Sequence, residues 1–398
     1  MPSLVCVPFG VVKTFLASAI LSGGVVPADT TTPRWGLTRE RVFGAEGVGP
    51  SLTRIQDVLA GRAGTLYVLD ASEPYLHAFA VSGLRRWSVG RRGDGPQEFR
   101  TPSVLGHDGQ TLWVADRGFR RFTRFDPAGK LGTHIVLANR GGPSFQNADP
   151  LALVGGDSIL AMQVVGSTSS WTGESQEIAV LRGSLATGRS ERLALFTASY
   201  GRSSIRARVS AAGGGSGQTF MPQPFNDDPI VQASRDGRSV VIVHRTVNDS
   251  PFFSVTVILG PGDTLFAREY PYEQTRLDDR EFGAAIERIS QPRPGAPRGI
   301  AYNKDDIRVG AFRPKTFPPV ASLKTASDGT TWLLREYGEL RQRWTYLVLD
   351  RAGTPIGTVE LPAREKVMEF NGTYLWTVGE GSAGEPIVIQ YRVSKRGP

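Results

Sequence analysis

Short apolar runs separated by tight turns dominate the sequence. The runs are rich in Val, Leu, Trp, Tyr and Phe, the composition of half-buried β-strands. Many are preceded by turns such as Asp108-Gly109, Asp236-Gly237, Asp328-Gly329 and Asn371-Gly372, which suit hairpins because these pairs accept positive φ. Long amphipathic helical runs are nearly absent. The pattern therefore predicts an all-β protein built from hairpins.

The apolar runs recur with a period. When the second strand of each unit is aligned on its apolar centre, the centres fall near Tyr67, Trp113, Leu160, Val241, Trp332 and Leu375. Three of the five spacings match the roughly 40–50 residues of a four-stranded propeller blade, and the other two match if each contains an insertion. The period predicts a six-bladed β-propeller of four-stranded blades, with insertions near 197–228 and 270–317.

The second insertion contains the clearest helical signal. Asp278 can cap a helix and Glu281 follows at capping-box spacing. Pro292 and Pro294 would end the helix. Between them lies an apolar stripe at helical spacing, formed by Phe282, Ala285, Ile286 and Ile289. We expect a short helix before blade five, either packed on the propeller or serving as a mobile lid.

The two ends of the chain are expected to pair. The last unit shows only three strands, which end at Tyr391-Arg392-Val393. The segment 39–43 can supply its outer strand and remove the free sheet edges.

The first 28 residues have the composition of a signal peptide. Lys13 precedes an apolar run over 14–26, and Val26-Pro27-Ala28 fits a small-x-small cleavage site. We therefore predict a signal over residues 1–28 and one propeller domain over 29–398, secreted or periplasmic, with no membrane span in the mature chain. Cys6 is the sole cysteine and lies inside this signal, which excludes disulfides and thiol catalysis from the mature form.

One linker carries a family resemblance. Gly-Asp-Gly-Pro-Gln-Glu-Phe at 93–99 is followed by Trp113-Val114-Ala115-Asp116, then Phe125-Asp126 and Gly129. This series resembles an NHL-type repeat, and the chain resembles bacterial exported six-bladed propellers of that group. In that pattern the Asp at the end of the second strand, here Asp70 and Asp116, binds backbone N–H groups and is structural.

Strand alternation assigns each connection to one of two faces. First-to-second and third-to-fourth connections emerge together on what we call the short-turn face. Second-to-third and interblade connections emerge on the opposite, long-loop face, which carries both insertions. Binding sites concentrate in such loops, so this face is the expected working surface. Its candidate contact residues are Arg117, Phe119, Arg120 and Trp171, with the acidic pair Asp227 and Asp228.

The charge narrows the choice of partner only a little. The formal net charge is +8, carried mostly by scattered Arg. A basic face could bind RNA, as some NHL propellers do, but export separates the protein from nucleic acid. The expected partner is a protein, peptide or carbohydrate, and nucleic acid is disfavoured.

No catalytic residue emerges from the sequence. The four His (His77, His107, His134, His244) are not expected to converge at the axis, and no nucleophile elbow is found. We expect a binding scaffold without cofactor. The alternative is a hydrolase or lyase of the lactonase type, with Ca or another divalent metal held by carboxylates at the channel mouth. Its candidate ligands are Asp57, Asp149, Asn226, Asp227, Asp228 and Glu369.

Overall fold

The computed structural model describes residues 32–44, 52–109, 111–137, 145, 148–155, 158–165, 176–198, 204–211, 214–247, 249–292 and 299–395. These residues form eight sheets, six of which are antiparallel and four-stranded. We number the six sheets 1 to 6 in the order of their first strands along the chain. The architecture is all-β, as the sequence predicts.

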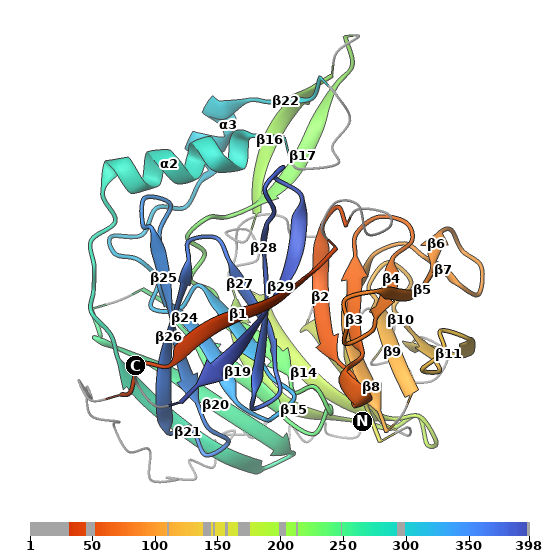
Figure 1. Ribbon diagram of the computed structural model, residues 1–398. Helices are drawn as coiled ribbons and strands as arrows, with labels where there is room; N and C mark the ends of the chain where they lie inside the picture. Colours follow the sequence, from red (N-terminus) through yellow and green to blue (C-terminus); the bar gives the residue numbers. More distant parts are fainter. Residues whose placement is uncertain are drawn as a thin grey trace, which may run out of the picture.

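Each four-stranded sheet runs from a first strand at the centre to a fourth strand at the periphery (Figure 1). The first strands are β2 (Ile55–Ala60), β8 (Pro102–Asp108), β12 (Asp149–Val154), β18 (Ile230–Ala233), β23 (Ser322–Thr325) and β27 (Lys366–Phe370). The second strands are β3 (Leu66–Asp70), β9 (Thr111–Asp116), β13 (Ser158–Val165), β19 (Val240–His244), β24 (Thr331–Glu336) and β28 (Tyr374–Glu380). All six aligned apolar centres therefore fall on second strands.

The third and fourth strands complete the sheets. The third strands are β4 (Leu76–Phe79), β10 (Arg121–Phe125), β14 (Gln176–Ser184), β20 (Phe252–Gly260), β25 (Arg343–Leu349) and β29 (Pro386–Ser394). The fourth strands are β5 (Arg85–Val89), β11 (Leu131–Val136), β15 (Ser190–Ala198), β21 (Asp263–Pro271), β26 (Pro355–Pro362) and β1 (Gly36–Phe43).

The first strands contact one another in a closed ring. β2 touches β8, β8 touches β12, and the series continues through β18, β23 and β27 back to β2. Sheets arranged around an axis in this way define a β-propeller. Bulky side chains fill the space between neighbouring sheets, and Trp113 and Trp332 on second strands are 1% and 0% exposed. Interblade packing is thus the role of both tryptophans.

The ring closes through the N-terminal strand. β1 pairs antiparallel with β29, from Gly36 opposite Ser394 to Phe43 opposite Val388. Trp35, just before β1, is 3% exposed and meets Trp332 edge to face at 6.0 Å. Its indole N–H donates to the Ile356 carbonyl at 3.2 Å. The predicted pairing of the two chain ends is confirmed.

Both insertions combine into one projecting unit on the long-loop face (Figure 1). The first forms the hairpin β16 (Ser204–Ser210) and β17 (Ser216–Pro222), and the second adds α2 (Asp279–Ser290), β22 (Ala301–Tyr302) and α3 (Lys304–Gly310). The minor elements η1 (Arg62–Gly64), β6 (Arg91–Arg92) and β7 (Glu98–Phe99) lie in turns and linkers. Within the described ranges, no helix is long and apolar enough to cross a membrane.

Helix α2 begins where the sequence predicts. The Asp278 carboxylate accepts the Glu281 N–H at 2.8 Å, and the predicted apolar stripe is buried. Glu281, however, does not turn back to the cap. Its carboxylate accepts the backbone N–H groups of Glu339 and Leu340 and so attaches the helix to the β24–β25 loop. The helix is packed in this structure, and Pro294 lies outside the described residues.

Candidate functional site

A buried ion pair lies on the propeller axis, toward the short-turn face. Arg235 leaves the turn after β18, and Asp57 lies on β2. The guanidinium meets both carboxylate oxygens, at 2.7 and 3.0 Å. Their side chains are 4% and 3% exposed. Arg235 also donates to three backbone carbonyls, which lie on different first strands. The acceptors are Val58, Leu105 and Met368.

Two further charges complete this axial cluster. Lys324 on β23 donates to Asp57 at 2.6 Å, and Glu369 on β27 lies 3.0 Å from the Arg235 Nε. The other Glu369 oxygen accepts the N–H groups of Ser327 and Phe370, both at 2.8 Å. The four side chains (Asp57, Arg235, Lys324, Glu369) therefore form a charge-balanced cluster that joins four of the six sheets.

Burial and ion pairing shift the pKa values of Asp57 and Glu369 in opposite directions. Burial alone would raise the pKa of Asp57, but the charges of Arg235 and Lys324 outweigh it and hold that pKa below its ordinary value. Burial prevails at Glu369 and raises its pKa. At Lys324, burial and the nearby Arg235 together lower the pKa. Asp57 is therefore the firmly ionised carboxylate of the cluster.

The cluster does not fit a divalent metal. Asp57 and Glu369 are two of the predicted candidate ligands, and the structure does bring them together. The space between them is occupied by the Arg235 guanidinium, with the Lys324 ammonium beside it. A metal ion would have to displace two buried cations. Among the described residues, no group of three or more His, Cys, Asp or Glu is placed to hold a metal.

Sequence reasoning missed the two cations. Arg235 was hidden in an ordinary Ser-Arg-Asp-Gly turn, where an Arg is usually solvated. Lys324 could have been singled out from the sequence. A Lys on a four-residue first strand faces either a neighbouring strand or the propeller axis. Asp57 interrupts an apolar first strand in the same way.

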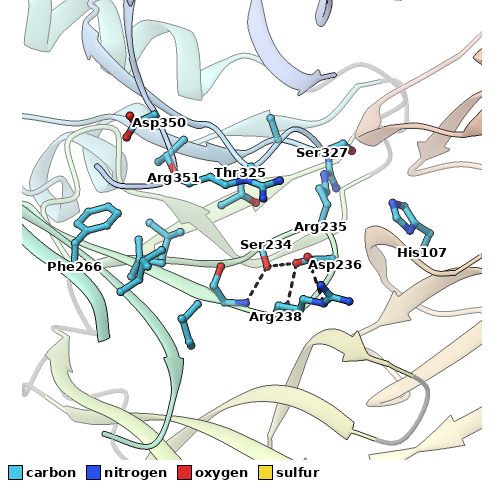
Figure 2. A pocket seen from close by; sticks show the side chains of 18 residues that line it. His107, Ser234, Arg235, Asp236, Arg238, Phe266, Thr325, Ser327, Asp350 and Arg351 are labelled. Atoms are coloured by element: carbon cyan, nitrogen blue, oxygen red, sulfur yellow. Dashed lines mark hydrogen bonds and ion pairs between the residues drawn. The ribbon is translucent and has the colours of Figure 1, made fainter. Parts of the chain in front are cut away.

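A cavity of about 280 Å³ lies beside the cluster, between sheets 4 and 5 (Figure 2). Apolar side chains that include Val241, Val257 and Phe266 form part of its wall, and polar or charged side chains such as Arg238 and Asp350 form the rest. Its axial end holds Arg235 and Asp236 with His107 next to them, and Phe266 lies at the other end (Figure 2). His107, which the sequence did not lead us to expect beside the axis together with the other His residues, lies on first strand β8 and lines this cavity.

The remaining His residues are structural. His77 lies on third strand β4 and shares a hydrogen bond with the Ser88 hydroxyl at 2.8 Å. His134 lies on fourth strand β11, away from the axis. His244 packs edge to face on Phe196 of the neighbouring sheet, with ring centroids 6.5 Å apart. The His side chains therefore do not converge.

The predicted acidic pair serves to anchor loops on the other face. The Asp227 carboxylate accepts the Val247 N–H at 2.9 Å, and Asp227 is 8% exposed. Asp228 is joined to Asn226 through both its N–H and its carboxylate. The buried Arg245 donates to the Asn226 side chain and to the Asp228 carbonyl. Asp149, the remaining candidate metal ligand, lies on β12 opposite Met162.

One of the predicted rim residues, Phe119, has an aromatic ring held between two cations. Phe119 lies in the β9–β10 loop, and the guanidinium groups of Arg100 and Arg121 are each 4.3 Å from its ring centroid. Arg117 and Arg120, on either side of it in sequence, are exposed. Trp171, the other predicted contact, lies outside the described residues.

The NHL-like linker holds this ring in place. Arg121 is 8% exposed and donates to the carbonyls of Gly95 and Glu98, which belong to the Gly-Asp-Gly-Pro-Gln-Glu-Phe segment. Asp116, at 0% exposure, accepts N–H groups from both sides of the loop, as the resemblance implies for this position. The donors are Arg100, Thr101, Gly118 and Phe119.

We call the exposed cations of this region the arginine patch, which comprises Arg91, Arg92, Arg100, Arg117 and Arg120. Glu98 pairs with Arg91 at 2.7 Å and Asp94 pairs with Arg100 at 2.8 Å. The patch thus gathers five exposed arginines, two of which are in these ion pairs. The patch lies on the long-loop face, because it combines an interblade linker with a second-to-third loop.

Comparison with solved structures returns distant propeller-like neighbours. A member of the DUF4221 family from Bacteroides vulgatus has 10% identity and a TM-score of 0.48, covering 91% of this chain and 99% of that one. Virginiamycin B lyase from Staphylococcus aureus has 10% identity and a TM-score of 0.42, with coverage of 90% and 99%. The calcium-binding protein regucalcin from Agrobacterium tumefaciens has 13% identity and a TM-score of 0.40, with coverage of 90% and 96%.

At such low sequence identity and TM-score, the neighbours give no information about the activity of this chain. No family model matches the chain, and no curated protein matches it. The class of protein is therefore defined by its own sheets: a β-propeller with a charge-balanced axial cluster and an arginine patch on the long-loop face.

Proposed function

We propose that this chain is an exported, NHL-like, six-bladed propeller over residues 29–398 that acts as a binding scaffold. The six four-stranded sheets serve as the six blades, with β1 as the outer strand of the last. The linker at 93–99 supports the NHL-like assignment, because it joins sheets 1 and 2 and positions the next blade's loop. Export rests on the signal-like composition of residues 1–28.

The ligand of this scaffold is an anionic polymer rich in carboxylates, of protein or carbohydrate origin. One observation carries this assignment: Phe119 is fixed between the guanidinium groups of Arg100 and Arg121 beside the arginine patch. A ring and its cations that are already ordered lose little conformational entropy on binding. Arginine forks match carboxylates with two parallel hydrogen bonds. Trp171 remains a candidate contact, whereas the acidic Asp227 and Asp228 would repel such a ligand and suit only the metal-dependent alternative.

The metal-dependent hydrolase or lyase has less support. Its best axial carboxylates are neutralised by Arg235 and Lys324. Its best loop pair, Asp227 and Asp228, is engaged with Val247 and Asn226. A metal ion could bind these carboxylates only if their present ion pairs and hydrogen bonds were broken.

Titration with poly-L-glutamate tests the proposal. We expect the Arg117→Gln, Arg120→Gln double variant to bind roughly five- to tenfold more weakly, because each exposed charge pair contributes about 0.2–1 kcal/mol. The control is Arg280→Gln with Arg308→Gln, which removes the same charge from exposed positions on α2 and α3. Equal loss in both variants would show that only net charge matters and would overturn the assignment of the patch.

A further inference from the structure

The projecting sheet on the long-loop face ends in an exposed edge strand. Its strand order is β17, β16, β22, and no described strand pairs with the outer edge of β17 (Figure 1). Most of the seven residues of β17 are exposed. An edge strand of this kind presents N–H and C=O groups that can pair with another extended chain.

The hydrogen bonds of β16 show which β17 residues face outward. The Arg208 N–H donates to Asp306 and its C=O accepts from Asn303, so both groups point away from β17. Arg208 lies opposite Gln218 in the register. In an antiparallel pair, such a position is non-hydrogen-bonded on both strands. The N–H and C=O of Gln218, and those of Ser216 two residues earlier, therefore point to the outer edge.

β17 lacks the devices that usually protect an edge. The strand Ser216–Pro222 contains no charged residue, and its Pro stands at the far end. The sheet is also held rigidly from behind. Ile205 and Met221 pack with Ile286 and Ile307 of α2 and α3 in one buried cluster. A partner strand would meet a preformed edge.

The exposed side of this edge is basic and aromatic. Phe220 is 50% exposed, and the Arg206 guanidinium lies 6.0 Å from its ring centroid. The two residues are opposite each other in the register, so Arg206 reaches toward the edge strand. Arg208, on the same side of β16, is paired with Asp306 at 2.7 Å. Arg206 is therefore the charge that an incoming strand would meet.

We propose that β17 accepts an extended acidic segment of another protein as a fourth strand of this sheet. The main chain would pair with Ser216 and Gln218, and an acidic side chain would lie beside Arg206 and Phe220. A second copy of the chain fits less well, because it would bring two Arg206 side chains together on a protein that already carries a charge of +8. This site is separate from the arginine patch and does not depend on it.

The test uses a fluorescein-labelled seven-residue peptide that alternates valine and aspartate, and its lysine counterpart, with anisotropy as the readout. Gln218→Pro removes one outward N–H without affecting the bonds to β16. We expect it to weaken binding roughly tenfold, since one backbone hydrogen bond is lost. The matched control, Gln218→Ala, keeps the N–H and should bind like the parent.

Arg206→Gln supplies a second variant that does not touch the backbone. We expect it to abolish the preference for the aspartate peptide over the lysine peptide. Equal binding of both peptides to the parent protein, or equal affinity of the Pro and Ala variants, would overturn the proposal. So would a dimer in sedimentation equilibrium that Gln218→Pro dissociates, because the occupant would then be a second copy.

Discussion

The Arg235 guanidinium lies 2.7 Å from the Asp57 carboxylate, although 178 residues separate them in the chain. One residue leaves the turn after β18 and the other lies on β2, on different sheets of the ring. Both are nearly inaccessible to solvent, so neither charge can be hydrated when the other is removed. The ion pair can therefore form only when the ring of sheets is closed, because its two charges come from different sheets.

Arg235→Met should destabilise the fold by about 3–5 kcal/mol, because it leaves two buried carboxylates with one remaining cation. Urea unfolding at neutral pH measures the change. Arg238→Met, three residues further on in the same turn, is the control, since its side chain is 81% exposed. We expect this control to change stability by less than about 0.5 kcal/mol. Equal effects of the two substitutions would contradict the role given to the axial cluster.

Removal of residues 1–43, which deletes β1, should lower the free energy of unfolding by more than about 3 kcal/mol. The deletion exposes the β29 edge and empties the sites of Trp35 and Phe43, both 3% exposed. Removal of residues 1–31 is the control, since it spares β1. The denaturation midpoints of the two truncated chains give the comparison, and identical midpoints would show that β1 does not close the ring.

Asp116→Ala should destabilise the protein by about 2–4 kcal/mol, because several backbone N–H groups lose their buried acceptor. It should also weaken poly-L-glutamate binding without changing any arginine, since Phe119 loses its fixed position. Asp126→Ala is the matched control: this Asp accepts two N–H groups in an exposed turn. If Asp116→Ala left the affinity for poly-L-glutamate unchanged, the β9–β10 loop would not be part of the binding site.

Stability should fall as the pH drops from about 6.5 toward 4. Burial, with the Arg85 charge, lowers the pKa of His77 from 6.5 to about 4. Between these values the unfolded chain binds more protons than the folded one, so unfolding is favoured by up to about 1.4 kcal/mol per pH unit. His77→Gln should flatten the pH dependence measured by urea unfolding at pH 7, 6 and 5. An unchanged slope would show that His77 does not titrate in this range.

Most of the secondary structure could be predicted because its signals are local. A turn such as Asp328-Gly329 accepts positive φ whatever surrounds it, and Gly329 has φ of 86° in the structure. The cap at Asp278 and the stripe behind it also depend only on nearby residues. Hairpin spacing then indicated how many blades to expect and which face the loops would occupy.

The axial cluster and the projecting sheet could not be predicted, because each depends on the tertiary structure. Asp57 and Glu369 were visible as acidic residues on first strands, but their partners are determined by the closure of the ring. Arg235 looked like a solvated turn residue until the fold buried it. Likewise, β16 and β22 come from separate insertions and become one sheet only when both pack against α2 and α3.

The sequence by itself determined strands, turns, helix α2 and the loop-bearing face, since these follow from local backbone preference and alternation. The tertiary structure alone decided which charges are buried together and which strand edge is left exposed, since both depend on contacts between distant segments.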